Sequence, residues 1–375
     1  MSAQAFAIDA PDSRLHRLPL ATLYLTERCN SRCVSCDYWR HGRTDMNLDA
    51  VTRLLPSLAR LRTRVVLLSG GEPLLNPEWP AIAGLLRERG MKVWLLTSGL
   101  SLAKHARRAG ELFDAITVSL DGTDRATYAA IRGLDALDNV CDGIRAAAAH
   151  GVAPSIRVTV QRANFRQLPG LVSMAKGLGA RQVSFLAVDV ANPHAFGRTD
   201  DFGADLALRA EELPAFAEVL GFMEQEYAEE FRSGFIAESP QKMQRILQYF
   251  AAIHGRSPYP VVRCNAPEFS AVVGASGKVQ PCFFISGPAE STLHGGVVES
   301  GVVESGVVES GVVESGAAGS GAVGSGQARD LEAALNGGAM TALRGNIRAG
   351  HRAECKTCVC SMWRDPEQFD VSILG

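Results

Sequence analysis

The sequence has almost no net charge and no long apolar run, and both absences restrict the classes of function. Its 38 Lys and Arg residues nearly balance 40 Asp and Glu residues, which gives a formal net charge of −2. This balance gives no sign of the strongly basic surface that favours binding to nucleic acids or anionic membranes. No segment approaches the roughly 20 apolar residues that span a bilayer. We therefore expect neither a membrane nor a nucleic acid among the partners of this protein.

The first 17 residues also lack the features of a secretion signal, which combines a charged start with an apolar core. For a protein that is not exported, the nine cysteines have a better explanation than disulfide bonds. Reducing compartments keep thiols reduced, and clustered thiols there usually bind metals. We therefore expect a cytoplasmic protein whose cysteines are metal ligands.

Apolar segments of strand length alternate with segments of helical pattern between residues 20 and 188. This alternation predicts an α/β fold with a parallel sheet whose strands are joined by helices. Six such units fall short of the eight in a closed barrel, so we expect a partial (β/α)6 TIM-like barrel. The strands are expected at 20–26, 65–69, 92–97, 115–120, 155–160 and 182–188, and the helices at 48–61, 77–88, 101–108, 137–150 and 164–178.

The rest of the chain is expected to form a connector and a small second domain. The connector has a helical pattern that is interrupted at Gly234 and Pro240. Apolar alternation on both sides of Gly274-Ala275-Ser276-Gly277 predicts a β-hairpin further on. We divide the chain into a barrel, a helical connector and a small α+β domain built from a hairpin and helices, at residues 1–205, 206–260 and 261–375.

A short repeat interrupts this second domain. The pentapeptide Gly-Val-Val-Glu-Ser occurs four times without change between Gly296 and Ser315, and two looser copies follow. A five-residue period is far below the 20–50 residues of folded repeats. We expect residues 295–326 to be a flexible surface insertion, after which a helical pattern resumes over residues 327–348.

Three cysteines follow the first predicted strand, and Cys29, Cys33 and Cys36 have the spacing C-x3-C-x2-C. Three thiolates in one loop can hold three irons of a [4Fe–4S] cluster and leave the fourth iron open to another ligand. A zinc site is the alternative, although zinc usually takes four ligands and His41 is the nearest further candidate. The spacing resembles the signature of the radical S-adenosylmethionine (SAM) superfamily.

Further motifs that resemble this superfamily stand at the ends of the predicted strands. Gly70-Gly71-Glu72-Pro73 follows the second strand and is similar to the motif that binds the methionyl ammonium group of SAM. Ser98 follows the third strand, in a Thr-Ser-Gly where the family commonly has Thr-Asn-Gly. Ser119-Leu120-Asp121-Gly122 ends the fourth strand, and the resemblance implies that Ser119 lies near the ribose or carboxylate of SAM.

Two features leave alternatives open. Arg157 on the fifth strand could reach the SAM carboxylate or form an ordinary salt bridge at the rim. The family often has an aromatic residue before the third cysteine, where this chain has Ser35, so Tyr38 or Trp39 could cover the adenine instead or simply pack against the barrel. The resemblance implies these cofactor-binding residues: Gly70, Gly71, Glu72, Pro73, Ser98, Ser119, Asp121, Arg157 and Tyr38.

Five more cysteines lie late in the chain: Cys264, Cys282, Cys355, Cys358 and Cys360. The first two flank the predicted hairpin, whose ends must lie close together. Cys355 and Cys358 form a C-x2-C pair. Four such thiolates can hold one zinc ion or a second iron–sulfur cluster, and Cys360 could replace one of them or be a plain thiol. The ninth, Cys141, lies alone in a helical pattern and is expected in the core.

This late cysteine set resembles the twitch domain of radical SAM enzymes, a shortened SPASM domain that houses one auxiliary [4Fe–4S] cluster. The resemblance implies a radical SAM oxidoreductase or maturase that cleaves SAM reductively to a 5′-deoxyadenosyl radical. This radical would abstract hydrogen from a small-molecule or peptide substrate, while the auxiliary cluster relays an electron. A reducing partner such as flavodoxin or ferredoxin is implied as well.

The sequence does not identify the substrate. Polar residues after the sixth strand that could contact it are Asp189, Asn192, His194 and Arg198. A molybdenum-cofactor cyclase is set aside, because that relative uses three late cysteines and a Gly-Gly tail. The alternative to an enzyme is a non-catalytic iron–sulfur or zinc-binding protein that serves as a scaffold or sensor.

Overall fold

The computed structural model describes residues 13–192, 195–198, 205–293, 330–360 and 362–364. The repeat expected to form an insertion at 295–326 lies outside the described residues, as does His194. None of the helices in the described ranges has the length and apolar character needed to cross a membrane.

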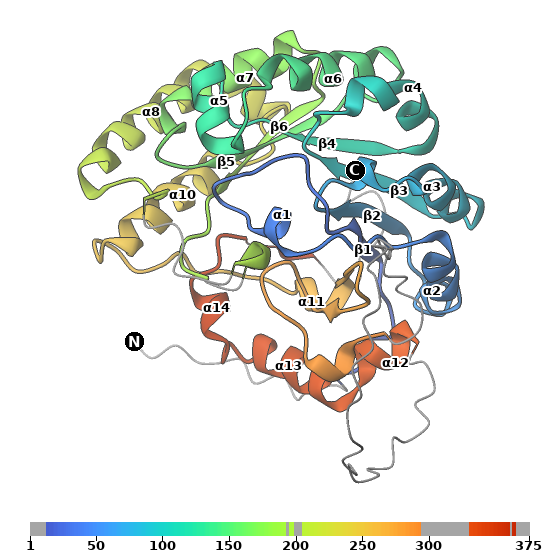
Figure 1. Cartoon of the computed structure of the whole chain (residues 1–375). Coiled ribbons are helices and arrows are strands. Elements are labelled where there is room, and N and C mark those ends of the chain that lie inside the picture. The colour runs from blue at the N-terminus through green and yellow to red at the C-terminus, as the bar shows by residue number, and fades with distance from the viewer. Residues whose placement is uncertain (1–12, 193–194, 199–204, 294–329, 361, 365–375) are drawn as a thin grey trace, which may run out of the picture.

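Six parallel strands form the centre of the fold (Figure 1). They lie in chain order, and each pairs in parallel with the next. The strands are β1 (Leu20–Thr26), β2 (Val65–Gly70), β3 (Lys92–Thr97), β4 (Ala115–Ser119), β5 (Ser155–Val160) and β6 (Gln182–Ala187). The predicted α/β fold with a parallel sheet is confirmed, and the predicted strand bounds agree to within one residue.

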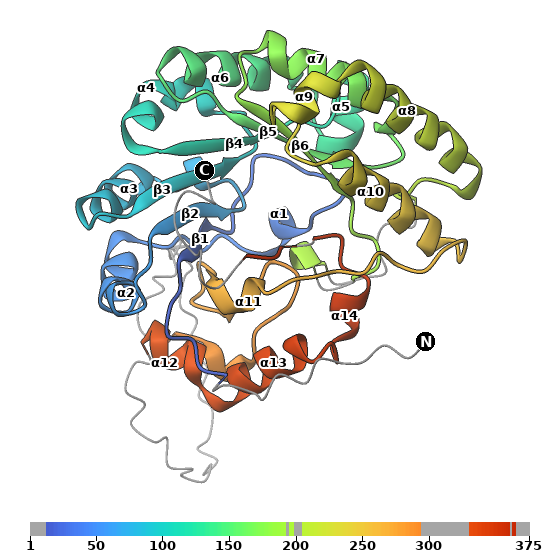
Figure 2. The ribbon, with the colours of Figure 1, turned by 180° about the vertical axis from the view of Figure 1, so that it is seen from behind.

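Helices cover the outer side of this curved sheet (Figures 1 and 2). Their apolar faces are buried against the strands because each is amphipathic, as in α2, where Val51, Leu54 and Leu58 are buried. The covering helices are α2 (Leu48–Arg60), α3 (Trp79–Glu88), α4 (Leu102–Leu112), α6 (Leu137–Ala149) and α7 (Leu168–Gly177). Cys141 of α6 is buried, as expected.

The pattern did not predict several short helices, among them α1 (Tyr38–His41) and α5 (Arg125–Arg132). The second of these, α5, contributes to the site. It begins after Asp124, whose side chain accepts a hydrogen bond from the backbone N–H of Thr127. It ends at Gly133, which has a left-handed φ of 75°. Tyr128 and Ile131 are its buried apolar side chains, and eight residues are too few to show a clear helical period.

The predicted hairpin forms, but it extends the barrel sheet. β7 (Ser270–Val273) and β8 (Val279–Gln280) pair antiparallel. β7 also pairs in parallel with β1, from Leu20 with Ser270 to Leu23 with Val273. The sheet therefore has eight strands, in the order β6-β5-β4-β3-β2-β1-β7-β8. Because β1 and β7 run in parallel, the loops after both strands lie at the same edge of the sheet.

The connector is helical, as α8 (Leu213–Glu226), α9 (Ala228–Arg232) and α10 (Pro240–Ile253). Gly234 interrupts it with a left-handed φ of 76°. Pro240 starts α10 instead of ending a helix, because proline suits the first helical turn. Short helices complete the C-terminal half beside the hairpin (Figure 2); they are α11 (Ala266–Phe269), α12 (Leu331–Asn336), α13 (Gly338–Arg348) and α14 (Ala353–Lys356).

Candidate functional site

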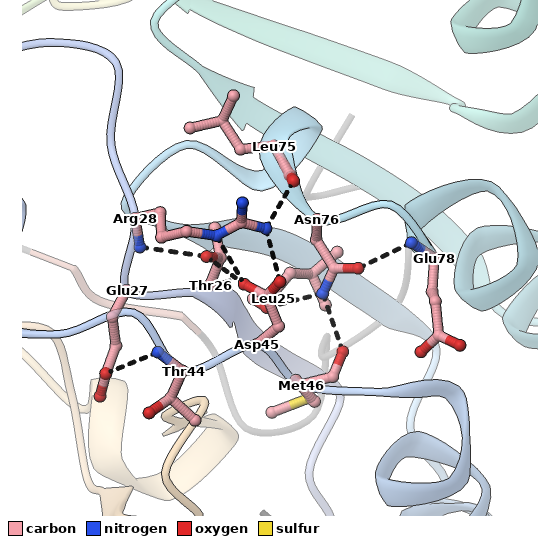
Figure 3. Close-up of polar contacts among 10 residues, drawn as sticks. All are labelled: Leu25, Thr26, Glu27, Arg28, Thr44, Asp45, Met46, Leu75, Asn76 and Glu78. Carbon is pink, nitrogen blue, oxygen red and sulfur yellow. Dashed lines mark hydrogen bonds and ion pairs between the residues drawn. The ribbon is translucent and has the colours of Figure 1, made fainter. Parts of the chain in front are cut away.

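A polar network fixes the chain where β1 passes into the first cysteine loop (Figure 3). Arg28, the residue before the first cysteine, forms an ion pair with Asp45 and donates from Nε to Oδ1 at 3.1 Å. The side-chain amide of Asn76 donates to the backbone oxygens of Leu25 at 2.7 Å and Met46 at 2.8 Å. Because Asn76 is buried, water is poorly placed to replace these bonds. The network therefore sets the direction in which the cysteine loop leaves the sheet.

Cys29, Cys33 and Cys36 line one cavity of about 210 Å³ at the C-terminal ends of the strands. Their loop lies against the end of α5, where Arg32 N donates to Arg132 O at 3.1 Å. Gly133 permits this approach, because a Cβ there would lie 2.3 Å from the backbone oxygen of Arg32. The structure thus brings the three predicted ligands to the mouth of the barrel, where enzymes with related barrels place their sites.

The donor set fits an iron–sulfur cluster better than one metal ion. Within the described residues, no three His, Cys, Asp or Glu side chains converge in the way that ligands of a single ion do. A [4Fe–4S] cluster makes a different demand, because each thiolate binds its own iron. Burial raises the pKa of Cys29 to about 11 and that of Cys36 to about 12. These thiols are therefore protonated at neutral pH until a metal displaces the proton.

Two glycines bring the end of β2 against the cysteine loop. Gly70 has a φ of 121°, which side chains disfavour, and a Cβ on Gly71 would lie 2.1 Å from the backbone oxygen of Arg28. Gly71 N donates to the oxygen of Thr26 at 2.8 Å. Both glycines line the cavity, so their backbone is accessible to a ligand there.

Glu72 has partners other than those expected for direct contact with SAM. It is fully buried and is not one of the cavity-lining residues. Its Oε2 accepts a hydrogen bond from Ser98 N at 2.7 Å, and its Oε1 accepts one from Thr97 Oγ1 at 2.8 Å. Burial raises the pKa of Glu72, and these hydrogen bonds oppose the rise. Glu72 therefore joins the ends of β2 and β3, and its contact with SAM stays a prediction.

Asp121 also lies outside the cavity lining. Its carboxylate is 2% exposed and forms a 2.6 Å ion pair with Arg132, whose side chain does line the cavity. Arg132 Nη1 in turn donates to Cys33 Sγ at 3.4 Å. Arg132 was not predicted as a site residue because its helix, α5, was not predicted. The Asp124 cap and Gly133 at the two ends of that helix are the signal that could have revealed it.

The other predicted cofactor-binding residues divide into two groups. Pro73 is buried at the start of a short 3-10 helix outside the lining, and the Arg157 side chain is exposed, also outside the lining. Trp39 lies away from the cavity with the Arg40 guanidinium 4.4 Å from its ring. The second group consists of the predicted cofactor-binding residues that line the cavity, and these are Gly70, Gly71, Ser98, Ser119 and Tyr38.

A second cavity, of about 310 Å³, adjoins the first. The hairpin turn supplies part of its wall, through Gly274, Ala275, Ser276 and Lys278. This turn reaches the barrel mouth because β7 pairs in parallel with β1. The residues that line both cavities are Tyr24, Tyr38, Phe196, Arg198 and Phe283.

Asp189 lies two residues after the end of β6 and also lines the first cavity. The residue is 3% exposed, and its Oδ1 accepts hydrogen bonds from the backbone N–H groups of Ala191 at 3.0 Å and Asn192 at 3.1 Å. Its Oδ2 has no hydrogen-bond partner in the described part of the chain. Burial raises the pKa of Asp189 against the effect of these bonds. Arg198 is buried in the same region and donates to the backbone oxygen of Ser35 at 3.1 Å.

The five late cysteines come together from three separate parts of the chain. Burial raises the pKa of Cys282 to about 12 and that of Cys360 to about 11. Cys360 N donates to Cys358 Sγ at 3.4 Å, so the ambiguous fifth cysteine is adjacent to the others. One small, mostly apolar cavity is lined by all of them: Cys264, Cys282, Cys355, Cys358 and Cys360.

Comparison with known proteins finds a family match for the N-terminal part of the chain alone. Residues 23–165 match the model of the radical SAM superfamily. GTP 3′,8-cyclase of Mycobacterium marinum is 40% identical over 140 residues, which cover 35% of this chain and 39% of that protein. Fe-coproporphyrin III synthase of Methanosarcina barkeri is 29% identical over 164 residues, covering 42% of this chain and 40% of that protein. The chain thus spans about two fifths of the length of these relatives, and the family match ends before the first late cysteine.

Solved structures extend the likeness in fold. The structure of anSMEcpe with bound AdoMet and the Cp18Cys peptide has a TM-score of 0.53 and 18% identity, covering 72% of this chain and 75% of that chain. Streptococcus suis SuiB bound to S-adenosylmethionine has a TM-score of 0.53 and 12% identity, covering 72% of this chain and 61% of that chain. At these identities the likeness shows the fold, which is the partial barrel predicted from the sequence.

Proposed function

We propose, on the premise that residues 23–165 form a radical SAM domain, that this protein is an enzyme that cleaves SAM reductively. The resulting 5′-deoxyadenosyl radical would abstract hydrogen from a small-molecule or peptide substrate. One observation carries the proposal: Cys29, Cys33 and Cys36 line the same cavity as the ends of β2, β3 and β4. Metal ligands and cofactor-binding motifs, predicted separately from the sequence, share one space.

The chain's own groups would hold the cofactors as follows. Thiolates of the three cysteines would ligate three irons of a [4Fe–4S] cluster, and the open iron would be available to SAM. The hydroxyl groups of Ser98 and Ser119 and the backbone of the glycine turn offer hydrogen bonds in the same cavity. The cofactors supply the radical chemistry, while the protein binds and orients SAM and keeps water out.

The substrate is proposed to bind in the second cavity. That cavity adjoins the first at Tyr38 and Phe283, so a substrate there could present one carbon to the SAM site. Asp189 Oδ2 is a buried acceptor without a partner among the described residues. Asp189 lines the first cavity, and an unsatisfied buried oxygen is costly. We therefore propose that a hydroxyl, amine or amide on the part of the substrate that reaches into the first cavity donates to it.

The late cysteines are proposed to hold an auxiliary [4Fe–4S] cluster in a twitch-type domain. Their shared cavity supports this, since ligands of one cluster must surround one space. In this role the cluster would relay an electron, and flavodoxin or ferredoxin would be the reductant. The absence of a membrane or nucleic acid among the partners remains part of the same proposal.

The proposed function predicts that the wild-type protein cleaves SAM. After anaerobic reconstitution with iron and sulfide, reduction with dithionite in the presence of SAM is expected to release 5′-deoxyadenosine, which chromatography detects. Omission of dithionite is the control, because cleavage requires an electron. Tightly bound zinc together with no cleavage would instead indicate the scaffold or sensor.

Loss of late ligands is expected to remove only the auxiliary cluster. In a Cys264→Ala/Cys282→Ala variant, bound iron is expected to fall from about eight to about four atoms per chain, as the loss of one of two [4Fe–4S] clusters requires. Cleavage of SAM should persist, because the first cysteine loop is intact. Iron analysis and 5′-deoxyadenosine assays measure the two effects separately. Thr357→Ala, a change between two late cysteines, is the matched control, and an unchanged iron content in the double variant would contradict the auxiliary cluster.

A further inference from the structure

We propose that Arg132, held in place by Asp121, raises the reduction potential of the cluster bound by Cys29, Cys33 and Cys36. The inference rests on the proposed function, because it requires a cluster at these cysteines. It concerns a residue outside the sequence motifs, and it assigns to Asp121 a supporting role in place of direct contact with SAM.

The contacts of the Arg132 guanidinium carry the inference. Its Nη2 lies 2.6 Å from Asp121 Oδ2, and its Nη1 donates to Cys33 Sγ at 3.4 Å. The Arg132 side chain is 12% exposed and the Asp121 side chain 2%. Arg132 Nε is buried and has no hydrogen-bond partner in the described ranges, although the side chain lines the cavity. The guanidinium therefore lies against Cys33 at the cavity wall, and its buried Nε has no acceptor among the described residues.

Backbone hydrogen bonds hold the cysteine loop against the C-terminal end of α5. Arg132 O accepts a hydrogen bond from Arg32 N at 3.1 Å, and Ile131 O accepts one from Val34 N at 3.0 Å. The two amides that donate belong to the residues on either side of Cys33. The loop and the end of α5 are thus joined on both sides of the ligand, so the guanidinium cannot easily move away from its sulfur.

Asp121 is fixed independently. Its Oδ1 accepts a hydrogen bond from the backbone N–H of Thr159 on β5 at 2.6 Å, and its backbone oxygen accepts one from Asn164 Nδ2 at 2.9 Å. Asp121 is therefore a rigid anchor that orients Arg132, as carboxylates behind metal ligands commonly do.

The sign of the effect follows from electrostatics. Reduction adds one negative charge to the cluster, and a positive group that donates a hydrogen bond to a ligand sulfur stabilises the reduced form more than the oxidised form. The site is partly buried, which strengthens the interaction relative to water. The described hydrogen bonds and ion pairs link the guanidinium directly to the sulfur and link Asp121 to Arg132. The charge in contact with the ligand is therefore positive, and the potential should rise.

The test compares reduction potentials in the reconstituted full-length protein. An Arg132→Gln variant is expected to be harder to reduce, by about tenfold in the reduction equilibrium, or about 59 mV for one electron. Potentials are measured by titration followed by electron paramagnetic resonance. Addition of SAM identifies the relevant cluster, because SAM binding should perturb only the signal of the cluster at the open iron. Arg125→Gln, an exposed change on the same helix, should leave the potential unchanged.

A second variant keeps the test decisive if Arg132→Gln does not fold. Breaking a buried ion pair by removing one partner is strongly destabilising, because the other charge is left buried alone. An Asp121→Asn/Arg132→Gln variant replaces the charged pair by a neutral one that can still form a hydrogen bond, so it decides the question if Arg132→Gln binds no iron. A full iron content with wild-type potential in this variant would show that the Asp121–Arg132 pair has no net effect on the cluster, and would overturn the proposal. Failure of the wild type to bind iron would instead overturn the proposed function itself.

Discussion

Replacing Cys29, Cys33 and Cys36 together with alanine is expected to abolish SAM cleavage and to halve the bound iron, from about eight to about four atoms per chain. All three cysteines line the cavity into which the cofactor-binding loops also face. Without their thiolates no cluster can form there, and no electron can reach SAM. Iron analysis after reconstitution and chromatography for 5′-deoxyadenosine measure the two losses.

The matched control is Cys141→Ala. Cys141 is a buried thiol on α6 that lines neither the cavity of the first cysteine set nor that of the late set. The Cys141→Ala variant should therefore retain the iron content and the SAM cleavage of the wild type. Deoxyadenosine from the triple variant, or a triple variant with the iron content of the wild type, would place the SAM-cleaving cluster elsewhere. Together with the late-cysteine variant, the experiment assigns each cluster to its own ligands.

The largest expected loss of stability is that of Glu72→Ala. The substitution removes a fully buried carboxylate and leaves the backbone N–H of half-buried Ser98 and the hydroxyl of buried Thr97 without their acceptor. Each unsatisfied buried donor costs roughly 1–3 kcal/mol, so we expect the free energy of unfolding to fall by about 3 kcal/mol. Urea unfolding followed by circular dichroism measures the total, and amide hydrogen exchange at Ser98 reports the local loss.

Two further glutamate variants test whether the loss of stability comes from the hydrogen bonds that Glu72 accepts. Glu72→Gln keeps one carbonyl acceptor and should lose roughly half as much stability. Glu78→Ala removes an exposed carboxylate that accepts a single bond from Leu48 N at 2.8 Å, and should cost at most about 0.5 kcal/mol, as surface changes usually do. If Glu72→Ala cost no more than Glu78→Ala, the carboxylate would not be what joins β2 to β3.

The strands could be predicted closely because each is a short, mostly apolar run, buried throughout in β1 and at alternate residues in β3, β4 and β5. Parallel strands under helices show such runs as a rule, and β1, β3 and β5 have the predicted bounds. The three early cysteines could be predicted as neighbours because they are local in sequence. The late cysteines could be grouped because a hairpin joins its own ends, and the structure places all five around one cavity.

The other features of the fold and the site could not be predicted, because they depend on contacts between residues that are far apart in the sequence. Glu72 and Asp121 were recognised as motif residues, but their immediate partners come from other strands and from α5. The pairing of β7 with β1 joins residues 250 positions apart in the sequence, and a four-residue apolar run does not reveal its neighbour. Arg132 could not be predicted because its helix is short and because its proposed role depends on a tertiary contact.

The pairing of β7 with β1 also has a consequence for biosynthesis. Leu20 pairs with Ser270, which the ribosome adds 250 residues later. Throughout that interval the outer edge of β1 presents unpaired N–H and C=O groups to other chains, and exposed strand edges template aggregation. We therefore expect the nascent barrel to be prone to aggregation until its last strands emerge, and the hairpin that completes the site to end this period as well.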